Sequence, residues 1–468
     1  MNEVSSENLN FYPYKIFEDQ GELYLYTVNQ SGLFKIDNKT IAILNQDRKE
    51  YTEAFDNVSS LLDKQEFDEL LQKMKDVKFI ESPENDNLIK TQLHKEIEKE
   101  ISSLTLMIVQ ECNMKCSYCY GEGGEYYDKG KMSLETAIQS IEYLITNSKS
   151  EKLLICLFGG EPLLNFDLFK AIISYCRSRE EQTGKTFSFT TTTNGTLLTK
   201  EIEEYLVNNK VTVQISVDGD QNTHNSNRYF DNKIGSYEII IRRTKNMRQK
   251  GLLTARATIT NKQFDLVETF NHLHELGFRA IPMSPAFNLL SDDDYKTLTA
   301  EYYRLIDHFE HLIKENDYVK YSKLSILNGF MHRINKGYVR SLPCGVGRSM
   351  YAIDINGDIY PCHRFVSNKE YILGNVYTSV SRREAFLEEI NVDNHKKCGN
   401  CWARNLCIGG CPNENLMSTG SVGEMTENIC ELTRNIYEKL IKVYLRLTNE
   451  EKERLFNTKN NLTVVSKV

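Results

Sequence analysis

Residues 104 to 119 read LTLMIVQECNMKCSYC, in which an apolar run leads directly into a loop with three cysteines. The run has the composition of a buried strand, and Cys112, Cys116 and Cys119 follow it with no fourth cysteine nearby. Three thiolates suit a 4Fe–4S cluster with one open iron, whereas structural zinc takes four protein ligands. The alternative is a zinc knuckle that borrows a distant ligand.

The strand-then-helix pattern continues after this loop. Amphipathic helices are expected after Ser133, Asn165 and Thr199 and near residues 235, 262 and 298. They alternate with five strand-like runs, KLLICLF (152–158), TFSFTTTTN (186–194), VTVQISVDG (211–219), TARATIT (254–260) and FRAIPMSP (278–285). Because parallel strands need helical crossovers, these six units predict an α/β fold, a partial (β/α)6 barrel like an incomplete TIM barrel.

The predicted strands have one apolar and one polar face. In VTVQISVDG, Gln214, Ser216 and Asp218 alternate with valine and isoleucine, and in TARATIT Arg256 and Thr258 alternate with alanine and isoleucine. A closed barrel fills its interior with branched apolar side chains, so a polar interior indicates an open barrel that holds a polar ligand. The alternative is an antiparallel edge with a solvated face.

Two further regions flank the barrel. Residues 23–37, LYLYTVNQSGLFKID, give two strand-like runs around a turn, and helical segments follow near 40–45, 51–62 and 67–77, so residues 1–82 predict a small winged-helix-like domain. A charged, polar segment at 83–103 is interpreted as a linker. The barrel is expected over 104–320 and a cysteine-rich C-terminal domain, ending in a helix, over 321–468.

The C-terminal region concentrates cysteines in Gly-rich sequence. Seven lie within about ninety residues, at Cys344, Cys362, Cys398, Cys401, Cys407, Cys411 and Cys430. Cys156 sits in the middle of a strand and Cys176 on an apolar helical face, so both are interpreted as core residues without a role.

Composition narrows the class of protein. The 468 residues carry a net charge of −8 without a dense Lys/Arg block, which argues against nucleic acid and anionic membranes as partners. The first twenty residues lack signal-peptide character, and no apolar stretch reaches membrane-spanning length. Twelve cysteines in such a chain favour metal ligation over disulfides, and a cytoplasmic location is expected.

The motifs at the strand ends resemble those of the radical SAM superfamily, whose members cleave S-adenosylmethionine (SAM). The CxxxCxxC loop is followed by Gly159-Gly160-Glu161 after the second strand and by Ser216-Val-Asp218-Gly219 after the fourth, with His224 and Arg228 beyond. The resemblance implies that Glu161 binds the SAM ammonium and that Ser216, with Arg228 or Arg256, binds its carboxylate. The SAM-binding set is then Tyr118, Gly159, Gly160, Glu161, Ser216, Asp218, Arg228 and Arg256.

The C-terminal cysteine spacing resembles the SPASM domain, which carries two auxiliary 4Fe–4S clusters. The resemblance assigns Cys344, Cys362 and Cys411 to auxiliary cluster I, and Cys398, Cys401, Cys407 and Cys430 to auxiliary cluster II. Sulfatase-maturing relatives have an extra cysteine shortly after the first, but residues 345–354 contain none. Auxiliary cluster I therefore has either an open iron, able to take a substrate thiolate, or a ligand other than cysteine, such as a carboxylate or Met350.

Together these resemblances imply a radical SAM/SPASM peptide maturase of the sactipeptide or ranthipeptide type. Such an enzyme abstracts a hydrogen from a ribosomally made peptide and links a cysteine sulfur to carbon, a thioether crosslink. The implied cofactors are three 4Fe–4S clusters and SAM, and the implied partners are a precursor peptide with its leader and a flavodoxin- or ferredoxin-type reductant. The N-terminal domain resembles a leader-recognition domain, to whose sheet the leader adds a strand.

Several alternatives stay open at this point. Enzymatic ones are oxidation of Cys or Ser to formylglycine, as in sulfatase maturases, and carbon–carbon crosslinking. A noncatalytic chain would be an electron carrier or a zinc-stabilised peptide-binding protein. The N-terminal domain has the alternative of a winged-helix cap or dimerisation element. The sequence does not indicate the peptide, the linked residues, a general base or the oligomeric state.

Overall fold

A curved parallel sheet forms the centre of the computed structural model, which describes residues 8–82, 85, 100–366, 368–378 and 380–456. Six of its strands run parallel in the order β12-β11-β9-β8-β7-β4. This confirms the predicted partial barrel. The strands are β4 (Ser103–Gln110), β7 (Lys152–Gly159), β8 (Thr186–Thr193), β9 (Thr212–Ser216), β11 (Leu253–Ile259) and β12 (Met283–Pro285).

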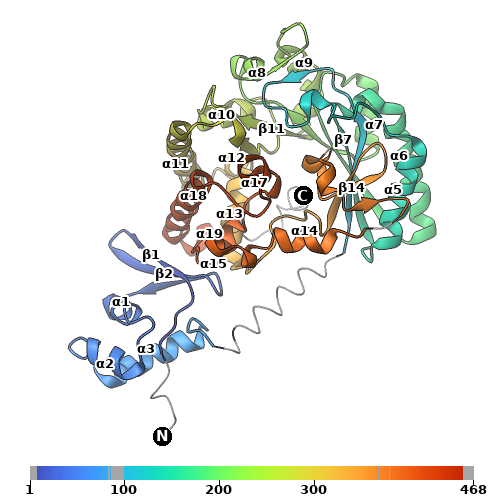
Figure 1. Cartoon of the computed structure of the whole chain (residues 1–468). Helices are drawn as coiled ribbons and strands as arrows, with labels where there is room; N and C mark the ends of the chain where they lie inside the picture. The colour runs from blue at the N-terminus through green and yellow to red at the C-terminus, as the bar shows by residue number, and fades with distance from the viewer. Residues whose placement is uncertain (1–7, 83–84, 86–99, 367, 379, 457–468) are drawn as a thin grey trace.

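Helices wrap the outer face of this sheet (Figure 1). They are α5 (Leu134–Asn147), α6 (Phe166–Thr183), α7 (Lys200–Asn208), α9 (Tyr237–Gln249), α10 (Leu266–Glu275) and α11 (Asp292–Lys314). The side chains of Ser133 and Thr199 cap α5 and α7, as expected from the sequence. Helix α11 begins six residues before the predicted position, because Ser291 and Asp294 form a capping box at its start.

The two faces of the strands differ as the alternation predicted. On β9, Val213 and Ile215 are fully buried beneath the helices, while Gln214 and Ser216 are half-buried on the concave face. On β11, Arg256 and Thr258 occupy the same concave face, since Arg256 pairs with Ser216 across the two strands. The concave face therefore carries the polar groups. Cys156 of β7 also lies on it, half-buried and hydrogen-bonded to Thr190 and Thr105, rather than in the apolar core.

The C-terminal region extends the same sheet. Strand β13 (Met350–Ile353) pairs in parallel with β4, and β14 (Asp358–Tyr360) and β15 (Gly374–Asn375) follow it as antiparallel strands. Because β4 leads into the CxxxCxxC loop, this pairing brings the chain between Cys344 and Cys362 next to that loop. The remaining C-terminal helices are α12 (Tyr318–Tyr321), α13 (Ser325–Lys336), α14 (Arg383–Glu389), α15 (Lys396–Gly399), α16 (Arg404–Cys407), α17 (Pro412–Thr419), α18 (Glu427–Arg446) and α19 (Asn449–Phe456).

The N-terminal module consists of three antiparallel strands and three helices. Strands β2 (Glu22–Thr27) and β3 (Gly32–Ile36) match the predicted runs, while β1 (Tyr14–Asp19) was not singled out from the sequence. The helices are α1 (Asn38–Leu44), α2 (Tyr51–Val58) and α3 (Lys64–Asp76), and they pack on the sheet around Phe67 and Phe79. Of the predicted linker 83–103, only residues 85 and 100–103 are described.

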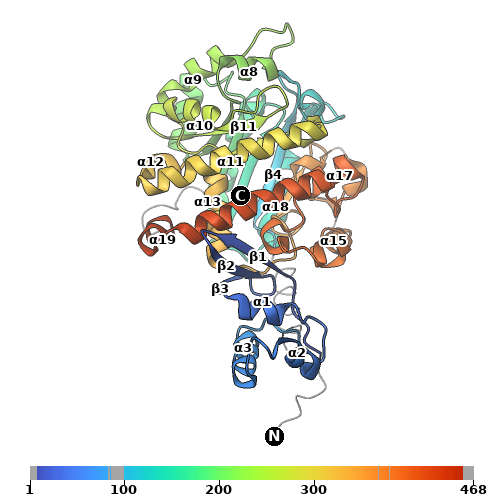
Figure 2. The same ribbon diagram turned by 90° about the vertical axis from the view of Figure 1, so that its left-hand side faces the viewer.

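The sheet of the N-terminal module also packs against the C-terminal region, below α18 (Figure 2). The rings of Phe17 and Tyr26 lie edge-on to Trp402, at centroid distances of 5.4 and 6.1 Å. Buried Asn405 donates to the Val28 carbonyl oxygen and to Ser31 Oγ in the turn between β2 and β3. The module is thus held by the segment between Cys401 and Cys407.

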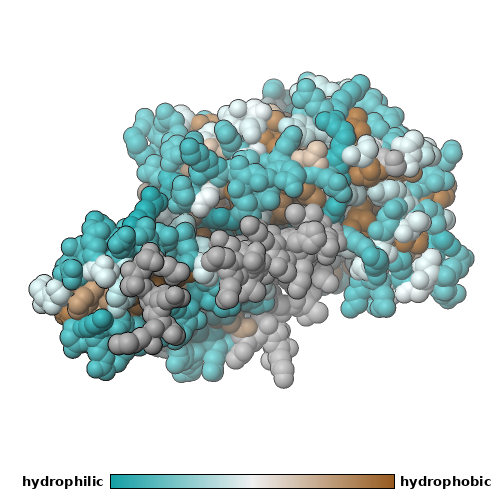
Figure 3. Space-filling model, turned by 60° about the horizontal axis from the view of Figure 1, so that its bottom comes forward, coloured by the Kyte–Doolittle hydropathy of each residue, from teal (hydrophilic) through white to brown (hydrophobic). Residues whose placement is uncertain are grey.

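The surface seen from below is mainly hydrophilic, and its apolar residues form small groups outside the grey atoms (Figure 3). None of the described helices combines the length and the hydrophobicity that crossing a bilayer requires.

Candidate functional site

The first three cysteines lie at the carboxyl end of β4, at the mouth of the barrel. Cys116 lies in the short strand β5 (Lys115–Cys116), which pairs with β10 (Arg228–Tyr229) so that Arg228 faces Cys116. Burial, together with the charges of Glu161, Cys116 and Cys119, raises the pKa of the Cys112 thiol to about 12. The three sulfurs are therefore close enough to influence one another electrostatically.

Two glycines allow the next motif to approach this loop. A Cβ on Gly159 would lie 2.0 Å from the Val109 carbonyl oxygen, and one on Gly160 would lie 2.1 Å from the Glu111 carbonyl oxygen. Gly159 also has a φ of +146°, which side-chain-bearing residues rarely adopt. The close contact places Glu161 directly beneath the cysteine loop.

Glu161 is completely buried at this position. Its Oε1 accepts hydrogen bonds from Thr193 Oγ1 at 2.6 Å and from the Leu163 amide at 3.1 Å, and its Oε2 accepts one from the Asn194 amide at 2.7 Å. Burial raises the pKa of the Glu161 carboxyl to about 7, although these hydrogen bonds lower it. Because a carboxylate oxygen accepts two hydrogen bonds, Oε2 keeps capacity for a further donor.

Tyr118, Asp218 and Arg228 form a buried network beside Cys116. Asp218 Oδ2 accepts from Tyr118 Oη at 2.6 Å and from Arg228 Nε at 3.0 Å, while its Oδ1 accepts from the Thr258 amide at 3.0 Å. Arg228 also points Nη1 at Cys116 Sγ, 3.6 Å away. Of the SAM-binding set expected from the sequence, these three residues therefore contact one another and the cysteine loop.

Ser216 and Arg256 face each other across β9 and β11 on the concave face, and Arg256 makes fewer polar contacts than Arg228. Arg256 donates from Nη1 to Ser284 Oγ at 2.8 Å, and among the described residues it has no ion pair. Burial lowers the pKa of Arg256, and the nearby charges of Arg364 and Arg228 lower this pKa further. An anion that enters the barrel thus finds an uncompensated guanidinium.

The seven C-terminal cysteines fall into two groups. Burial, together with the charges of Cys411 and Cys344, raises the pKa of Cys362 to about 12. Burial, together with the charges of Cys401, Cys430 and Cys398, likewise raises the pKa of Cys407 to about 12. All twelve cysteines are free thiols, and none of the His, Cys, Asp or Glu side chains in the described ranges form a group of three or more that fits a single metal ion.

Four residues at the site were not selected from the sequence: Asn194, Tyr120, His363 and Arg364. Asn194 points Nδ2 at Cys112 Sγ, 3.9 Å away, and donates to Asn113 Oδ1 at 2.9 Å. His363 packs its ring on Phe158 at 4.7 Å, and Arg364 stacks on Tyr120 at 5.1 Å. Their signal was position: Tyr120 follows Cys119, and His363 and Arg364 follow Cys362.

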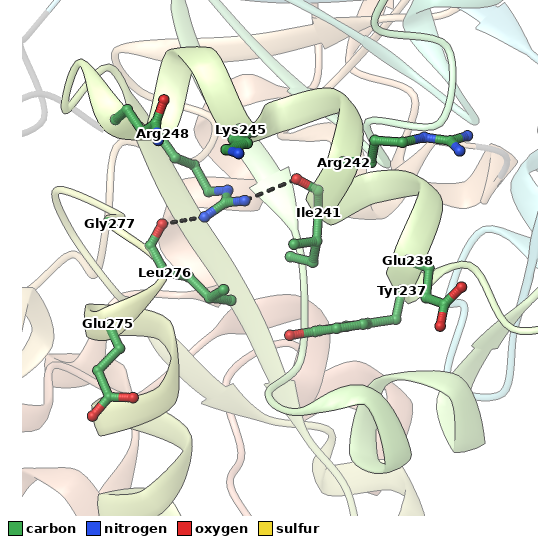
Figure 4. A pocket seen from close by; sticks show the side chains of 10 residues that line it. Tyr237, Glu238, Ile241, Arg242, Lys245, Arg248, Glu275, Leu276 and Gly277 are labelled. Carbon is green, nitrogen blue, oxygen red and sulfur yellow. Dashed lines mark hydrogen bonds between the residues drawn. The ribbon is translucent and has the colours of Figure 1, made fainter.

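A pocket of about 550 Å³ lies elsewhere, on the outer side of the barrel between α9 and the end of α10 (Figure 4). Arg248 lies across it and donates to the carbonyl oxygens of Ile241 and Leu276. The lining residues contain no cysteine and no residue of the expected SAM-binding set.

The barrel and its cysteine loop match a known family. The radical SAM superfamily matches residues 106–265, and SPASM, described as an iron–sulfur cluster-binding domain, matches residues 344–402. The chain carries a radical SAM domain and a SPASM domain. These domains bind 4Fe–4S clusters and SAM, as the cysteine spacing predicted.

Curated relatives of this radical SAM enzyme are distant in sequence. The radical SAM cyclopropyl synthase TigE of Paramaledivibacter caminithermalis is 23% identical over 93% of this chain and 95% of its own. A cysteine-type anaerobic sulfatase-maturating enzyme of Clostridium perfringens is 23% identical over 64% of this chain and 85% of its own. Mycofactocin maturase MftC of Mycolicibacterium smegmatis is 25% identical over 66% of this chain and 77% of its own.

Solved structures share the fold. The structure of anSMEcpe with bound AdoMet and the Cp18Cys peptide aligns with a TM-score of 0.62 at 21% identity, covering 74% of this chain and 99% of that one. Streptococcus suis SuiB bound to its precursor peptide SuiA aligns with a TM-score of 0.50 at 16% identity. This alignment covers 90% of this chain and 100% of the SuiB chain. The SuiB alignment covers more of this chain than the anSMEcpe alignment.

Proposed function

We propose that this radical SAM enzyme matures a ribosomally made precursor peptide by linking a cysteine sulfur to carbon. The observation that carries the proposal is the co-location, at the barrel mouth, of a CxxxCxxC loop with Cys362 and Arg364 of the C-terminal region. Bound SAM supplies a radical that takes a hydrogen from the substrate. The proposed domains are 1–82 for the peptide leader, 83–103 as linker, 104–320 for SAM and 321–468 for the auxiliary clusters.

The donor set fits three clusters in the proposed assignment. Cys112, Cys116 and Cys119 would hold the SAM cluster, because their sulfurs interact and no further cysteine lies in the loop. Two other groups of mutually interacting sulfurs would hold the auxiliary clusters, Cys344, Cys362 and Cys411 for cluster I and Cys398, Cys401, Cys407 and Cys430 for cluster II. With three cysteines, cluster I keeps an iron for a substrate thiolate or for a ligand other than cysteine.

The residues around SAM divide the binding task by charge. Glu161 Oε2 would accept a hydrogen bond from the methionine ammonium, since it has spare acceptor capacity beneath the cluster loop. Arg256, with Ser216 beside it, would receive the carboxylate, because its guanidinium lacks an ion pair within the described structure. Gly159 and Gly160 would leave room for the ligand, and Tyr118, Asp218 and Arg228 would hold the cluster loop in place.

The affinity for SAM is expected to depend on pH through Glu161. An acid whose pKa is raised to about 7 takes up a proton in the folded chain below that pH, so its contribution to folding stability is present below pH 4.5 and is lost as the pH rises to about 7. The ammonium needs the ionised carboxylate, so SAM affinity should fall up to about tenfold per pH unit below about pH 7. Equilibrium dialysis of SAM against reconstituted protein measures this dependence.

Two controls isolate Glu161. Glu161→Gln should bind SAM weakly at every pH, without the slope. 5′-Methylthioadenosine, which lacks the amino acid group, should bind the wild type with no slope. A slope that persists in Glu161→Gln would assign it to another group.

The N-terminal module is proposed to bind the leader of the peptide. Its sheet ends in β1 on one side and β3 on the other, so both edges present backbone groups to an added strand within the described structure. The relatives support a peptide substrate, since SuiB was crystallised with its precursor peptide SuiA and the alignment reaches over 90% of this chain. A flavodoxin- or ferredoxin-type protein is the proposed reductant.

A second candidate product has a carbon–carbon bond. TigE, whose name describes a cyclopropyl synthase, matches 93% of this chain, whereas the sulfatase-maturating relative matches 64% of it. A cyclopropane forms between carbon atoms and leaves any cysteine thiol free. Formylglycine formation from cysteine, in contrast, removes the sulfur from the peptide, whereas formation from serine removes two hydrogens and leaves every thiol in place.

Mass spectrometry of the treated peptide separates these products. The reconstituted enzyme would be incubated with SAM, reductant and the short peptide encoded beside its gene, then quenched and alkylated with iodoacetamide. A thioether gives a peptide lighter by two hydrogens with one fewer alkylated thiol. Loss of two hydrogens with every thiol still alkylated would instead indicate a carbon–carbon bond if the product does not react with a hydrazide, and a serine-derived formylglycine aldehyde if it does. Loss of sulfur would indicate formylglycine formed from cysteine.

A further inference from the structure

Arg228 stands in a defined relation to the SAM-cluster cysteines. Its Nη1 lies 3.6 Å from Cys116 Sγ, its Nε donates to Asp218, and its guanidinium lies over the ring of Tyr118 at 5.1 Å. The arginine side chain is 8% exposed and the aspartate is fully buried. The ion pair is therefore shielded from solvent counter-ions.

Arg364 repeats this arrangement at the first auxiliary group of cysteines. Its Nη1 lies 3.7 Å from Cys411 Sγ, its Nη2 pairs with Glu414, and its guanidinium lies over the ring of Tyr120 at 5.1 Å. Tyr118 and Tyr120 flank Cys119 in the sequence. Two arginine–carboxylate pairs thus stack on the two tyrosines of one loop, each with a guanidinium directed at one cysteine sulfur.

The third group of cysteines has a different environment. Arg434 acts electrostatically on Cys401 and Cys430, yet its side chain is 32% exposed and its partner Glu427 is 64% exposed. No hydrogen bond from an arginine to Cys398, Cys401, Cys407 or Cys430 occurs within the described residues. Solvent screens the Arg434–Glu427 pair more than the Arg364–Glu414 pair, whose side chains are 25% and 13% exposed, and it screens the Arg228–Asp218 pair least.

The geometry points to a redox-tuning role for the two arginines that face a cysteine sulfur: Arg228 raises the reduction potential of the SAM cluster, and Arg364 raises that of auxiliary cluster I. This inference rests on the proposed cluster assignment. A reduced cluster carries one more negative charge than an oxidised one, so a nearby cation and an N–H donor at a ligand sulfur stabilise the reduced state. The paired carboxylate acts in the opposite direction.

The two arginine–carboxylate pairs both lie at the barrel mouth, against the CxxxCxxC loop. The SAM cluster must accept an electron before it can pass one to SAM. Auxiliary cluster I, held by cysteines whose neighbour Arg364 contacts Tyr120 of the CxxxCxxC loop, would be able to take up the electron of the substrate radical after bond formation. Burial lowers the pKa of Arg256, and the charges of Arg364 and Arg228 lower this pKa further, so both cations act on the same part of the concave face. Each guanidinium nevertheless faces a different sulfur, Cys116 for Arg228 and Cys411 for Arg364.

Potentiometric titration followed by electron paramagnetic resonance tests the inference. Arg228→Gln should lower the ratio of reduced to oxidised SAM cluster at a fixed potential about tenfold, a shift of about 59 mV for one electron. Arg364→Gln should do the same for auxiliary cluster I only. Glu414→Gln should move auxiliary cluster I the other way, and the exposed Arg434→Gln should change no cluster more than about twofold.

Each electron paramagnetic resonance signal is assigned to its cluster by adding SAM or by removing the ligands of the other clusters. The SAM cluster is identified by the change in its spectrum when SAM is added, and auxiliary cluster I is read in protein whose SAM-cluster cysteines and Cys398 and Cys401 are alanine. Arg228→Lys and Arg364→Lys keep the charge without the fork of donors and should give smaller shifts.

Two results would overturn the inference while the proposed function stood. One is an unchanged midpoint in Arg364→Gln at full iron and sulfide content. The other is a shift in the same direction for Arg364→Gln and Glu414→Gln, which indicates a structural disturbance. Zinc in place of iron in the wild-type protein would instead refute the proposed function itself.

Discussion

Replacing Cys112, Cys116 and Cys119 together with alanine is expected to abolish SAM cleavage and to lower the iron content from about twelve to about eight per chain, each cluster holding four irons. The reason is that these thiols alone would hold the cluster that binds SAM, while the other seven lie in two separate groups. Iron, sulfide and zinc analysis after anaerobic reconstitution, with 5′-deoxyadenosine quantified by chromatography, measures both effects.

Cys176→Ala is the matched control. Cys176 is fully buried in α6 and belongs to the apolar core, so its loss should leave iron content and SAM cleavage unchanged. Iron that stays at about twelve in the triple variant would show that the loop holds no cluster. Stoichiometric zinc with little iron would indicate a zinc-stabilised binding protein instead.

Trp402→Ala is expected to free the N-terminal module from the C-terminal region. Trp402 meets Phe17 and Tyr26 edge-on, and truncating a large packed aromatic costs about 3 kcal/mol. A loss of about 3 kcal/mol corresponds to about a hundredfold in the opening equilibrium, so the amides of β2 and β3 should exchange about a hundredfold faster. Hydrogen exchange with mass spectrometry measures this loss, and the amides of β4 in the barrel serve as the internal reference.

Trp402→Phe keeps a ring in the same place and should retain most of the protection. Asn405→Ala should act in the same direction as Trp402→Ala, since Asn405 donates to the β2–β3 turn from the same segment. Equal protection of β2 and β3 in wild type and Trp402→Ala would show that the contacts of α18 with β1 suffice to hold the module.

Much of the fold was predictable because its signals are local. The alternation of Val213, Gln214 and Ile215 is a property of neighbouring residues, and so is the cap at Ser133. The short strand β12 was overestimated, since Pro282 has no amide hydrogen and β12 begins only at Met283. Strand β1 was missed because YKIFED gives only a brief alternation without a turn pair ahead of it.

The sequence by itself determined the chemistry, since the number and spacing of thiols in the CxxxCxxC loop limit which metal group the loop can hold. Only the tertiary structure decided the environment of those thiols. Cys116 and Arg228 are 112 residues apart, and Arg364 and Cys411 are 47 apart. Charge acts through space, so the arginine that faces a sulfur is fixed by the pairing of β5 with β10 and of β13 with β4, which no local pattern encodes.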